Sequence, residues 1–342
     1  MKEILVVDDN VTSLKQIAAF LAGSYGYFLV RSGAEAISTC ARECPDIILL
    51  DVEMPDMDGF ETIRILKDNP TMSHIPVIFL TGNQDNATEA AGLKFGARDF
   101  IRKPVEKDIL LHRLGLHLDI AGYQAQLENS VQTMTDSLAL SISELIECRD
   151  ENTGGHVART GKYVKTLGRE LLARGSYADE LSGLALEMMA RAAPLHDIGK
   201  IAVSDRILLK PGSLNDEEFA AMKRHAAIGA ELLEKMYERT PSQTYLKYAV
   251  MIAASHHEKY NGRGYPKGLS GEDIPLCGRI MAVADVYDAL VDNRVYRKGM
   301  SYTEAFRIIT DGRGTQFDPL IVDAFESCHL EFVSAKDSGQ RN

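Results

Sequence analysis

The residues with the greatest capacity for chemistry form a histidine and aspartate series in the second half of the chain. The series comprises His156, His196, Asp197, His225, His256, His257 and Asp285. Imidazole and carboxylate groups together bind Mn, Fe, Ni or Zn. A single buried histidine is usually a hydrogen-bonded core residue, but independent core histidines have no reason to occur as tandem pairs inside apolar stretches. We therefore expect these side chains to converge on metal.

The spacing within the series predicts a hydrolytic metal centre. His196 and Asp197 are adjacent, so on one helix they point in different directions, and Asp197 can bridge two metals while His196 binds one. Two cations about 3.5–4 Å apart acidify a bound water and hold the oxygens of a displacement at phosphorus. Lys200 lies one turn after His196, where it can neutralise a phosphate oxygen or protonate a leaving oxygen. The alternative is that Lys200 is a surface lysine.

A glycine-rich loop, HHEKYNGRGYPKGL at 256–269, follows the histidine pair. Gly262 and Gly264 lack a Cβ, which lets the backbone approach a ligand closely. Tyr265 offers an aromatic ring on which a purine could stack. We interpret this loop as part of a substrate site.

A basic patch at 292–301 supplies Arg294, Arg297 and Lys298 in an otherwise acidic protein of net charge −11. Guanidinium groups suit phosphate oxygens, although a solvated helix end would have the same composition. The net charge argues against a protein that binds duplex nucleic acid, whose domain should be basic. A substrate carrying phosphates therefore needs local cations such as these.

The elements that must position these residues read as helices. Helical patterns cover 131–149, 155–174, 178–194, 216–238, 244–257, 276–292, 302–312 and 318–329. We expect an all-α domain in which side chains from different helices meet in the interior, as metal ligands do in helical bundles.

The first third of the chain has a different pattern. Short apolar runs, ILVV, YFLV, DIILLD, IPVIFLT and ARDFIRK, alternate with amphipathic stretches. Continuous apolar strands separated by helices predict a parallel sheet covered on both faces. The expected fold is a doubly wound, flavodoxin-like α/β domain with its site at the carboxyl ends of the strands.

Polar residues lie at the ends of those expected strands. Asp8 and Asp9 close the first strand and Asp51 closes the third. Converging carboxylates repel one another and suit Mg, which retains several waters. Thr81 and Lys103 close the fourth and fifth strands, where a hydroxyl and an ammonium group could contact an incoming phosphoryl group.

The pattern VVDD…LLDVEMPDMDG…LTG…KP resembles the response regulator receiver domain over the whole first third. The resemblance implies that Asp51 is the phosphoacceptor and that Asp8, Asp9 and Asp51 hold Mg. It also implies that Thr81 and Lys103 form the switch that contacts the phosphoryl group. A cognate histidine kinase is the implied partner.

The pattern H…HDIGK…H…HHE…GRGYP…D…R resembles the HD-GYP domain of cyclic di-GMP phosphodiesterases. By that resemblance all seven residues of the series are metal ligands, Asp197 and Lys200 are catalytic, and Lys200, Gly264, Tyr265, Arg294 and Arg297 contact substrate. The implied reaction converts cyclic di-GMP to linear pGpG and, in some members, on to GMP. The alternatives are pGpG or another cyclic dinucleotide as substrate, or a sensor without catalysis.

Two departures from that family pattern bear on the site. Three-metal members carry a Glu one turn before the first histidine, where this chain has Asn152. We therefore expect two divalent metals, Fe or Mn ahead of Ni or Zn, and leave a third metal open because Glu147 or Glu151 could substitute. The usual Pro of the arginine stretch is Val295, which leaves the preference between cyclic and linear substrates open.

A helical seam connects the two parts. Leu127, Val131, Met134, Leu138 and Leu145 recur at spacings of four and three, with Ser141 in the missing slot. Such a heptad pattern favours a helix that pairs with a second copy, so we expect a homodimer. The alternative is that this apolar face packs on its own domain.

We expect a multidomain protein with a receiver at 1–122, a long helical connector at 123–150 and an all-α metal-dependent domain at 151–342. The chain has no apolar run long enough to span a membrane, and its N-terminus reads as a strand rather than a signal peptide. No pair of its five cysteines has metal or redox spacing. Reduced thiols favour a cytoplasmic location.

Overall fold

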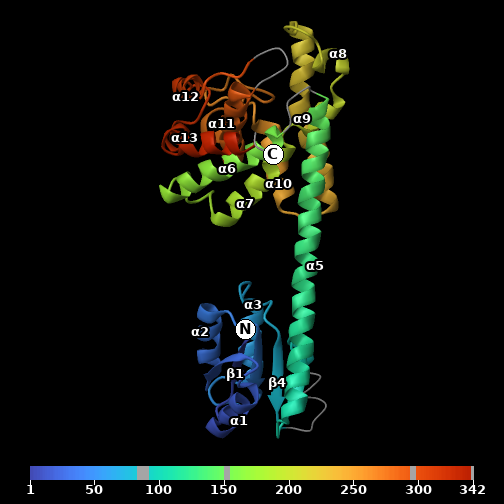
Figure 1. The fold of residues 1–342 in the computed structure, drawn as a ribbon, viewed down its shortest axis with the longest axis vertical. Coiled ribbons are helices and arrows are strands. Elements are labelled where there is room, and N and C mark those ends of the chain that lie inside the picture. The colour runs from blue at the N-terminus through green and yellow to red at the C-terminus, as the bar shows by residue number, and fades with distance from the viewer. Residues whose placement is uncertain (83–91, 150–154, 293–297, 340–342) are drawn as a thin grey trace. The chain divides into compact units, whose positions relative to one another are not determined.

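A computed structural model describes the chain except for residues 83–91, 150–154, 293–297 and 340–342 (Figure 1). The described chain divides into two compact units, Met1–Val131 and Gln132–Asn342. Among the described helices there is none with the length and apolar character needed to cross a membrane.

The first unit is built on a five-stranded parallel sheet in the order β2-β1-β3-β4-β5. The strands are β1 (Glu3–Val7), β2 (Gly26–Val30), β3 (Ile47–Asp51), β4 (Val77–Thr81) and β5 (Asp99–Arg102). Every residue of β3 and β4 is buried, because a central parallel strand is covered on both faces. The predicted strands and the doubly wound fold are confirmed.

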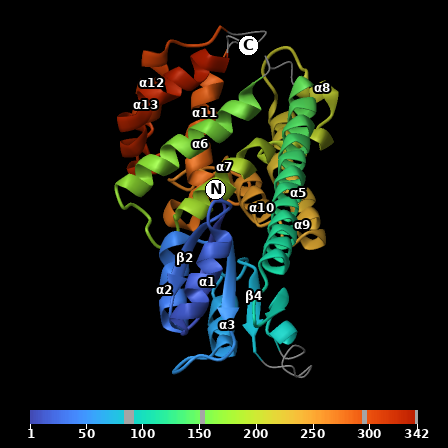
Figure 2. The ribbon, with the colours of Figure 1, turned by 60° about the horizontal axis from the view of Figure 1, so that its bottom comes forward.

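Helices cover the two faces of this sheet (Figure 2). α1 (Val11–Leu21) and the first part of α5 (Lys107–Cys148) pack on one face, where they share a core with β1 and β3. α2 (Gly33–Glu43) and α3 (Gly59–Asp68) pack on the other. This arrangement leaves the carboxyl ends of the strands as the edge where polar side chains gather.

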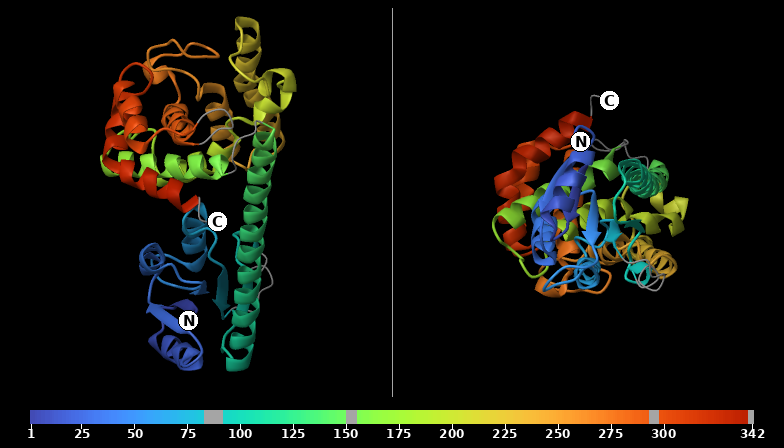
Figure 3. Two further views of the ribbon diagram at one scale, coloured as in Figure 1. Left: turned by 45° about the horizontal axis from the view of Figure 1, so that its top comes forward. Right: turned by 90° about the horizontal axis from the view of Figure 1, so that it is seen from below.

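The helix α5 is continuous from Lys107 to Cys148 (Figure 3). The sequence predicts a domain boundary at residue 122 and a long connecting helix, and α5 runs through Gly122 without a break. A Cβ at Gly122 would meet nothing within 4 Å, so this glycine marks an exposed helix position rather than an end. The predicted long connecting helix is confirmed.

The second unit is helical, as predicted. Its α-helices after α5 are α6 (His156–Ala173), α7 (Gly183–Ala192), α8 (Asp205–Leu208), α9 (Asp216–Arg239), α10 (Tyr245–Ser255), α11 (Leu276–Val291), α12 (Tyr302–Asp311) and α13 (Pro319–Gly339). Short 3-10 helices are η1 (Ala193–Leu195), η2 (Ile198–Ala202) and η3 (Gly271–Asp273). Packed aromatic rings of Tyr163, Tyr287, Phe325 and Phe332 lie in the core between α6, α11 and α13.

Two details differ from the sequence-based expectation. The helix expected at 178–194 begins only at Gly183, because the Ser182 side chain caps the Ala185 N–H and starts the helix there. His196 and Asp197 do not lie on one α-helix, since they fall between η1 and η2. The tighter 3-10 turns bring Lys200 next to Asp197 rather than one α-turn beyond His196.

Candidate metal and phosphoryl sites

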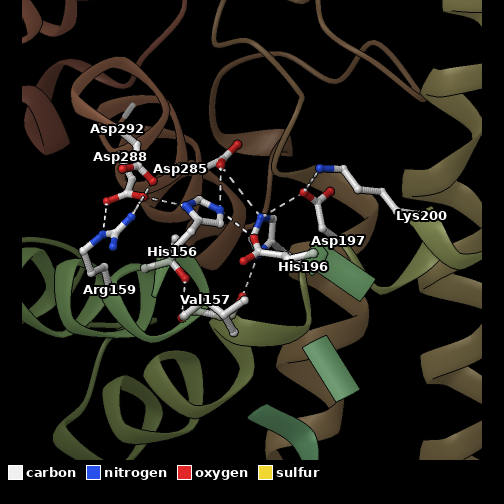
Figure 4. Close-up of polar contacts among 12 residues, drawn as sticks. His156, Val157, Arg159, His196, Asp197, Lys200, Asp285, Asp288 and Asp292 are labelled. Carbon is white, nitrogen blue, oxygen red and sulfur yellow. Dashed lines mark hydrogen bonds and ion pairs between the residues drawn. The ribbon is translucent and has the colours of Figure 1, made fainter. Parts of the chain in front are cut away.

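The seven predicted metal-binding residues come from separate elements and meet in the interior of the second unit. His156 begins α6, His225 lies in α9, and Asp285 lies in α11. His196 and Asp197 lie between η1 and η2, and His256 and His257 directly follow α10. Part of the cluster is drawn in Figure 4, where His156, His196 and Asp285 point toward one another.

The candidate ligand atoms form two adjoining groups, and within each group they lie within 4.8 Å of one another. One group is Asp197, His225, His256 and His257, and the other is His156, His196 and Asp285. In the second group the Oδ1 atom of Asp285 is 3.5 Å from His156 Nε2 and 3.8 Å from His196 Nε2.

Asp197 spans both groups with its two carboxylate oxygens. Its Oδ1 atom lies 3.1 Å from His225 Nε2 and 3.6 Å from His256 Nε2. Its Oδ2 atom lies 3.3 Å from His196 Nε2. A carboxylate placed in this way can bridge two cations, one in each group.

Several buried atoms in this cluster have no hydrogen-bond partner among the described residues. They include Nε2 of His196, His225 and His256, Oδ1 of Asp197 and Oε1 of Glu147. Leaving one buried polar group unsatisfied costs about 1–3 kcal/mol. Because these atoms point at one another and consist of imidazole nitrogens and carboxylate oxygens, they fit divalent transition cations.

The other nitrogen of each imidazole fixes its orientation. Nδ1 lies 2.9 Å from Ala193 O in His196, 2.7 Å from Met222 O in His225, and 3.0 Å from Ile252 O in His256. A carbonyl oxygen can only accept, so in each case Nδ1 carries a proton and Nε2 is the nitrogen that faces the site. This outer contact is the usual support of a metal-binding histidine.

The Nδ1 atom of His156 contacts a carboxylate instead of a backbone carbonyl. Its Nδ1 lies 2.7 Å from Asp288 Oδ2, and Arg159 donates two hydrogen bonds to the same buried carboxylate (Figure 4). Arg159 also donates to Asp292, which pairs with Lys336. No sequence pattern singled out these residues, although Arg159 and Asp288 each lie one turn beyond a predicted ligand, on the same helix face.

The charges around Asp197 set the protonation of the cluster. Burial alone would raise the pKa of Asp197, but Lys200 and His196 hold it well below its ordinary value. Lys200 Nζ lies 2.8 Å from Asp197 Oδ2, so the predicted lysine faces the site. Burial would lower the pKa of His196, but Asp197 and Asp285 raise it to about 9. A metal ligated by His196 Nε2 would therefore have to displace a proton at neutral pH.

Close backbone packing positions His225 opposite Asp197. A Cβ on Gly199, in η2, would collide with the carbonyl oxygen of His225, and it would lie 2.9 Å from Gly229 Cα. Only glycine allows η2 to lie this close to α9. The glycine between Asp197 and Lys200 therefore serves the geometry of the ligands.

The loop after the histidine pair is held by a residue that sequence reasoning did not single out. The buried carboxylate of Glu258 accepts backbone N–H bonds from Lys267 (2.7 Å), Gly268 (3.1 Å) and Leu269 (3.1 Å). A Cβ on Gly264 would meet the backbone at Glu258. Close packing within the loop is therefore enough to require a glycine at position 264, and no bound ligand is needed to explain it.

Tyr265 lies beside the metal-ligand cluster. Its ring centroid is 4.6 Å from that of His257, and Lys223 Nζ is 5.4 Å from the centroid of the Tyr265 ring. Burial raises the pKa of the Tyr265 hydroxyl, so this group stays neutral. The predicted phosphate contacts Arg294 and Arg297 lie outside the described residues, as do Asn152 and Val295.

The predicted phosphoryl site assembles at the carboxyl edge of the sheet. Oxygens of Asp8, Asp9 and Asp51 lie within 4.8 Å of one another. Lys103 Nζ is 2.6 Å from Asp51 Oδ2 and 2.8 Å from Asp8 Oδ2. Burial raises the pKa of Asp51 although Lys103 opposes it. Thr81, which is buried, ends β4 beside the strand that carries Asp51.

Comparisons with known proteins agree with both halves of this description. The response regulator receiver domain family matches residues 4–115, and the HD domain family matches residues 141–321. A Vibrio cholerae protein named "Probable cyclic di-GMP phosphodiesterase" is 43% identical over 337 residues, which cover 94% of this chain and 76% of that protein.

Two further relatives extend over most of both chains. The "Cyclic di-GMP phosphodiesterase response regulator RpfG" of Xanthomonas campestris is 36% identical over 332 residues, covering 94% of this chain and 86% of that protein. A "Cyclic di-GMP phosphodiesterase" of Thermotoga maritima is 31% identical over 355 residues, covering 97% and 92%.

An α/β receiver with an acidic phosphoryl site, followed by a helical unit with a histidine and aspartate cluster, defines a response regulator with a metal-dependent hydrolase as its output. The chain belongs to the HD domain family, within the group that carries a receiver domain in front. The resemblance stated from the sequence is confirmed.

Proposed function

We propose that this protein hydrolyses cyclic di-GMP to linear pGpG at the cluster centred on Asp197. The observation that carries the proposal is the set of buried imidazole and carboxylate atoms that face one another without hydrogen-bond partners in the described structure. The three relatives named for this activity support the substrate. Hydrolysis of pGpG or of another cyclic dinucleotide is the alternative.

We propose His156, His196, Asp197, His225, His256, His257 and Asp285 as the metal ligands. Two divalent cations bound there would acidify water and neutralise phosphate charge. The adjoining groups joined by Asp197 support two metals, and their nitrogen and oxygen donors suit Fe or Mn, with Ni and Zn also compatible.

The chain's own groups would orient the substrate beside these ligands. Lys200, held against Asp197 Oδ2, would contact a phosphate oxygen and supply a proton to the leaving oxygen. Tyr265, beside His257, would stack on a guanine base, and Gly264 would present the loop backbone. We assign phosphate contacts to Arg294 and Arg297 from the family resemblance alone.

We propose that phosphorylation of Asp51 by a cognate histidine kinase regulates this activity. The geometry of Lys103 and of the three carboxylates supports Mg binding by Asp8, Asp9 and Asp51. Thr81 and Lys103 would contact the phosphoryl group. We propose that residues 1–122 form the receiver, 123–150 the connector and 151–342 the hydrolase. We also propose a cytoplasmic location, because the five cysteines are all free. Asp51→Asn protein should incorporate no phosphoryl group from acetyl phosphate.

We propose that α5 pairs with α5 of a second copy. The seam residues Leu127, Val131, Met134, Leu138 and Leu145 are all more than half exposed. Large apolar side chains recurring at heptad spacing match an identical helix in a coiled coil. Their exposure argues against a face packed on its own domain.

The direct test is hydrolysis of cyclic di-GMP by full-length protein loaded with Mn or Fe, with and without acetyl phosphate. Products are separated by chromatography, and pGpG and another cyclic dinucleotide are assayed side by side. Wild-type protein should release pGpG, and His196→Ala/Asp197→Ala protein should not. The proposal fails if metal-loaded wild-type protein turns over none of these substrates in either phosphorylation state.

A further inference from the structure

The helix α5 brings one more carboxylate to the metal-ligand cluster. Glu147, the penultimate residue of α5, is 5% exposed, and its Oε1 atom lies 3.4 Å from His156 Nε2. Oε1 has no hydrogen-bond partner among the described residues. The hydroxyl of Ser143, one turn earlier on the same face, is also buried without one. A glutamate on a solvated helix face would have neither property.

His156 has no proton to spare for this carboxylate in its ligand form. Its Nδ1 is committed to Asp288, so a neutral His156 presents a lone pair at Nε2. Glu147 Oε1 and Asp285 Oδ1 then face the same lone pair, at 3.4 Å and 3.5 Å. Oxygens and a lone pair repel one another unless a cation lies between them.

The carboxylates described around the cluster outnumber the lysines and arginines paired with them. Asp288 and Asp292 are paired with Arg159 and Lys336. Glu147, Asp197 and Asp285 face the imidazoles, and Lys200 Nζ is paired with Asp197.

We propose that Glu147 is a ligand of the cation held by His156, His196 and Asp285. This inference rests on the proposed function, because it assumes that metal binds there. It adds a donor from α5, so the helix that leaves the receiver also contributes to the hydrolytic centre. Binding of this cation would hold the last turn of α5 against α6. Displacement of α5 would in turn lower the affinity of the site for this cation.

The rival reading is that Glu147 accepts a hydrogen bond from a protonated His156. The two readings predict opposite effects of Glu147→Gln on the metal-free protein. If Glu147 is a ligand, the substitution removes an uncompensated buried charge, and the midpoint of thermal unfolding rises. If it is an acceptor in an ion pair, the substitution breaks that pair and the midpoint falls.

The experiment is calorimetric titration of chelator-treated, full-length protein with Mn²⁺, together with the visible spectrum of the Co²⁺ form. Glu147→Gln should weaken one binding step about 10–100-fold and change the Co²⁺ spectrum, as His156→Ala does. Glu144→Gln, at an exposed position of the same helix, is the matched control and should titrate like wild type.

Two results would overturn the proposal. One is a Glu147→Gln protein that titrates with Mn²⁺ as wild type does, while wild type binds metal and hydrolyses substrate; the proposed function would then stand. The other is weakened binding accompanied by a lower unfolding midpoint without metal, which assigns Glu147 to an ion pair. A wild-type protein that binds no metal would instead remove the proposed function itself.

Discussion

Asp288 Oδ2 lies 2.7 Å from Nδ1 of His156, and Arg159 donates two hydrogen bonds to the same carboxylate. The contact orients the imidazole and makes its Nε2 lone pair more available to a cation. Asp288 is fully buried, and although burial acts in the opposite direction, His156 and Arg159 keep its pKa below the ordinary range. The buried carboxylate of Asp288 thus holds the His156 imidazole through Nδ1, the ring nitrogen that does not face the candidate metal site.

Asp288→Asn should therefore weaken metal binding about 10–100-fold. The amide cannot present two anionic oxygens to Arg159 and His156 together. Competition for Mn²⁺ against a fluorescent chelator measures the change. Asp311→Asn, at an exposed aspartate, is the control. An affinity equal to that of wild type would show that Asp288 does not support the ligand.

Lys200→Met should lower kcat for hydrolysis about 10²–10³-fold, the usual cost of losing one charge-stabilising donor. Lys200 is not a proposed ligand, so the metal content per chain should not fall. Lys247→Met, at an exposed lysine of α10, should leave both quantities unchanged. Steady-state kinetics and elemental analysis of one preparation check this, and a wild-type kcat would remove Lys200 from catalysis.

Gly199→Ala should reduce the free energy of unfolding by about 1–3 kcal/mol, as overpacking in a closed interior does. The added methyl group meets the backbone of α9 at His225 and Gly229. Gly183→Ala is the matched control, because a Cβ there meets nothing within 4 Å. Urea unfolding followed by circular dichroism compares them. Equal midpoints would mean that η2 and α9 are not in close contact.

The receiver unit should lose stability as pH falls below about 4, the ordinary pKa of an aspartate. Although burial raises the pKa of Asp99, hydrogen bonds from His117 and Arg113 lower it below the unfolded value. Its contribution is therefore complete above the unfolded pKa and disappears as pH falls through the folded one. Asp99→Asn should flatten this dependence in urea unfolding, and Asp119→Asn should not. An unchanged slope would contradict the assignment.

Leu138→Glu should convert the proposed dimer to monomer, because a charge in an apolar seam is desolvated without a partner. Leu138 is 53% exposed in the single chain, whereas the control position Leu330, on α13, is 79% exposed. Sedimentation equilibrium at several concentrations compares the two variants with wild type. Loss of the dimer in both variants, or in neither, would show that this seam is not the interface.

The elements and the candidate ligand set were predictable because their patterns are local. Apolar runs such as those of β3 and β4 identify central strands, and the paired residues His196-Asp197 and His256-His257 indicate candidate ligands through their adjacency. The seven residues were expected to converge because side chains from different helices meet in the interior of an all-helical domain. The geometry at each proposed ligand still had to come from the structure.

What the sequence did not predict depends on contacts between distant segments. The pairing of Asp288 with His156 joins residues 132 positions apart, and neither residue type signals the other. The 3-10 geometry around Asp197 follows from packing of Gly199 against α9, which no periodicity reveals. Glu258 resembles a surface glutamate in the sequence, and only its burial distinguishes it.

The most direct test of the central claim is elemental analysis of anaerobically purified full-length protein, wild type against Asp197→Ala. The claim is that Asp197 bridges two cations held by imidazoles and carboxylates from separate elements. Wild-type protein should carry about two divalent transition ions per chain, and Asp197→Ala protein should retain about one or fewer. A wild-type protein that hydrolyses substrate while carrying no transition metal, or an Asp197→Ala protein with full metal content, would contradict the account.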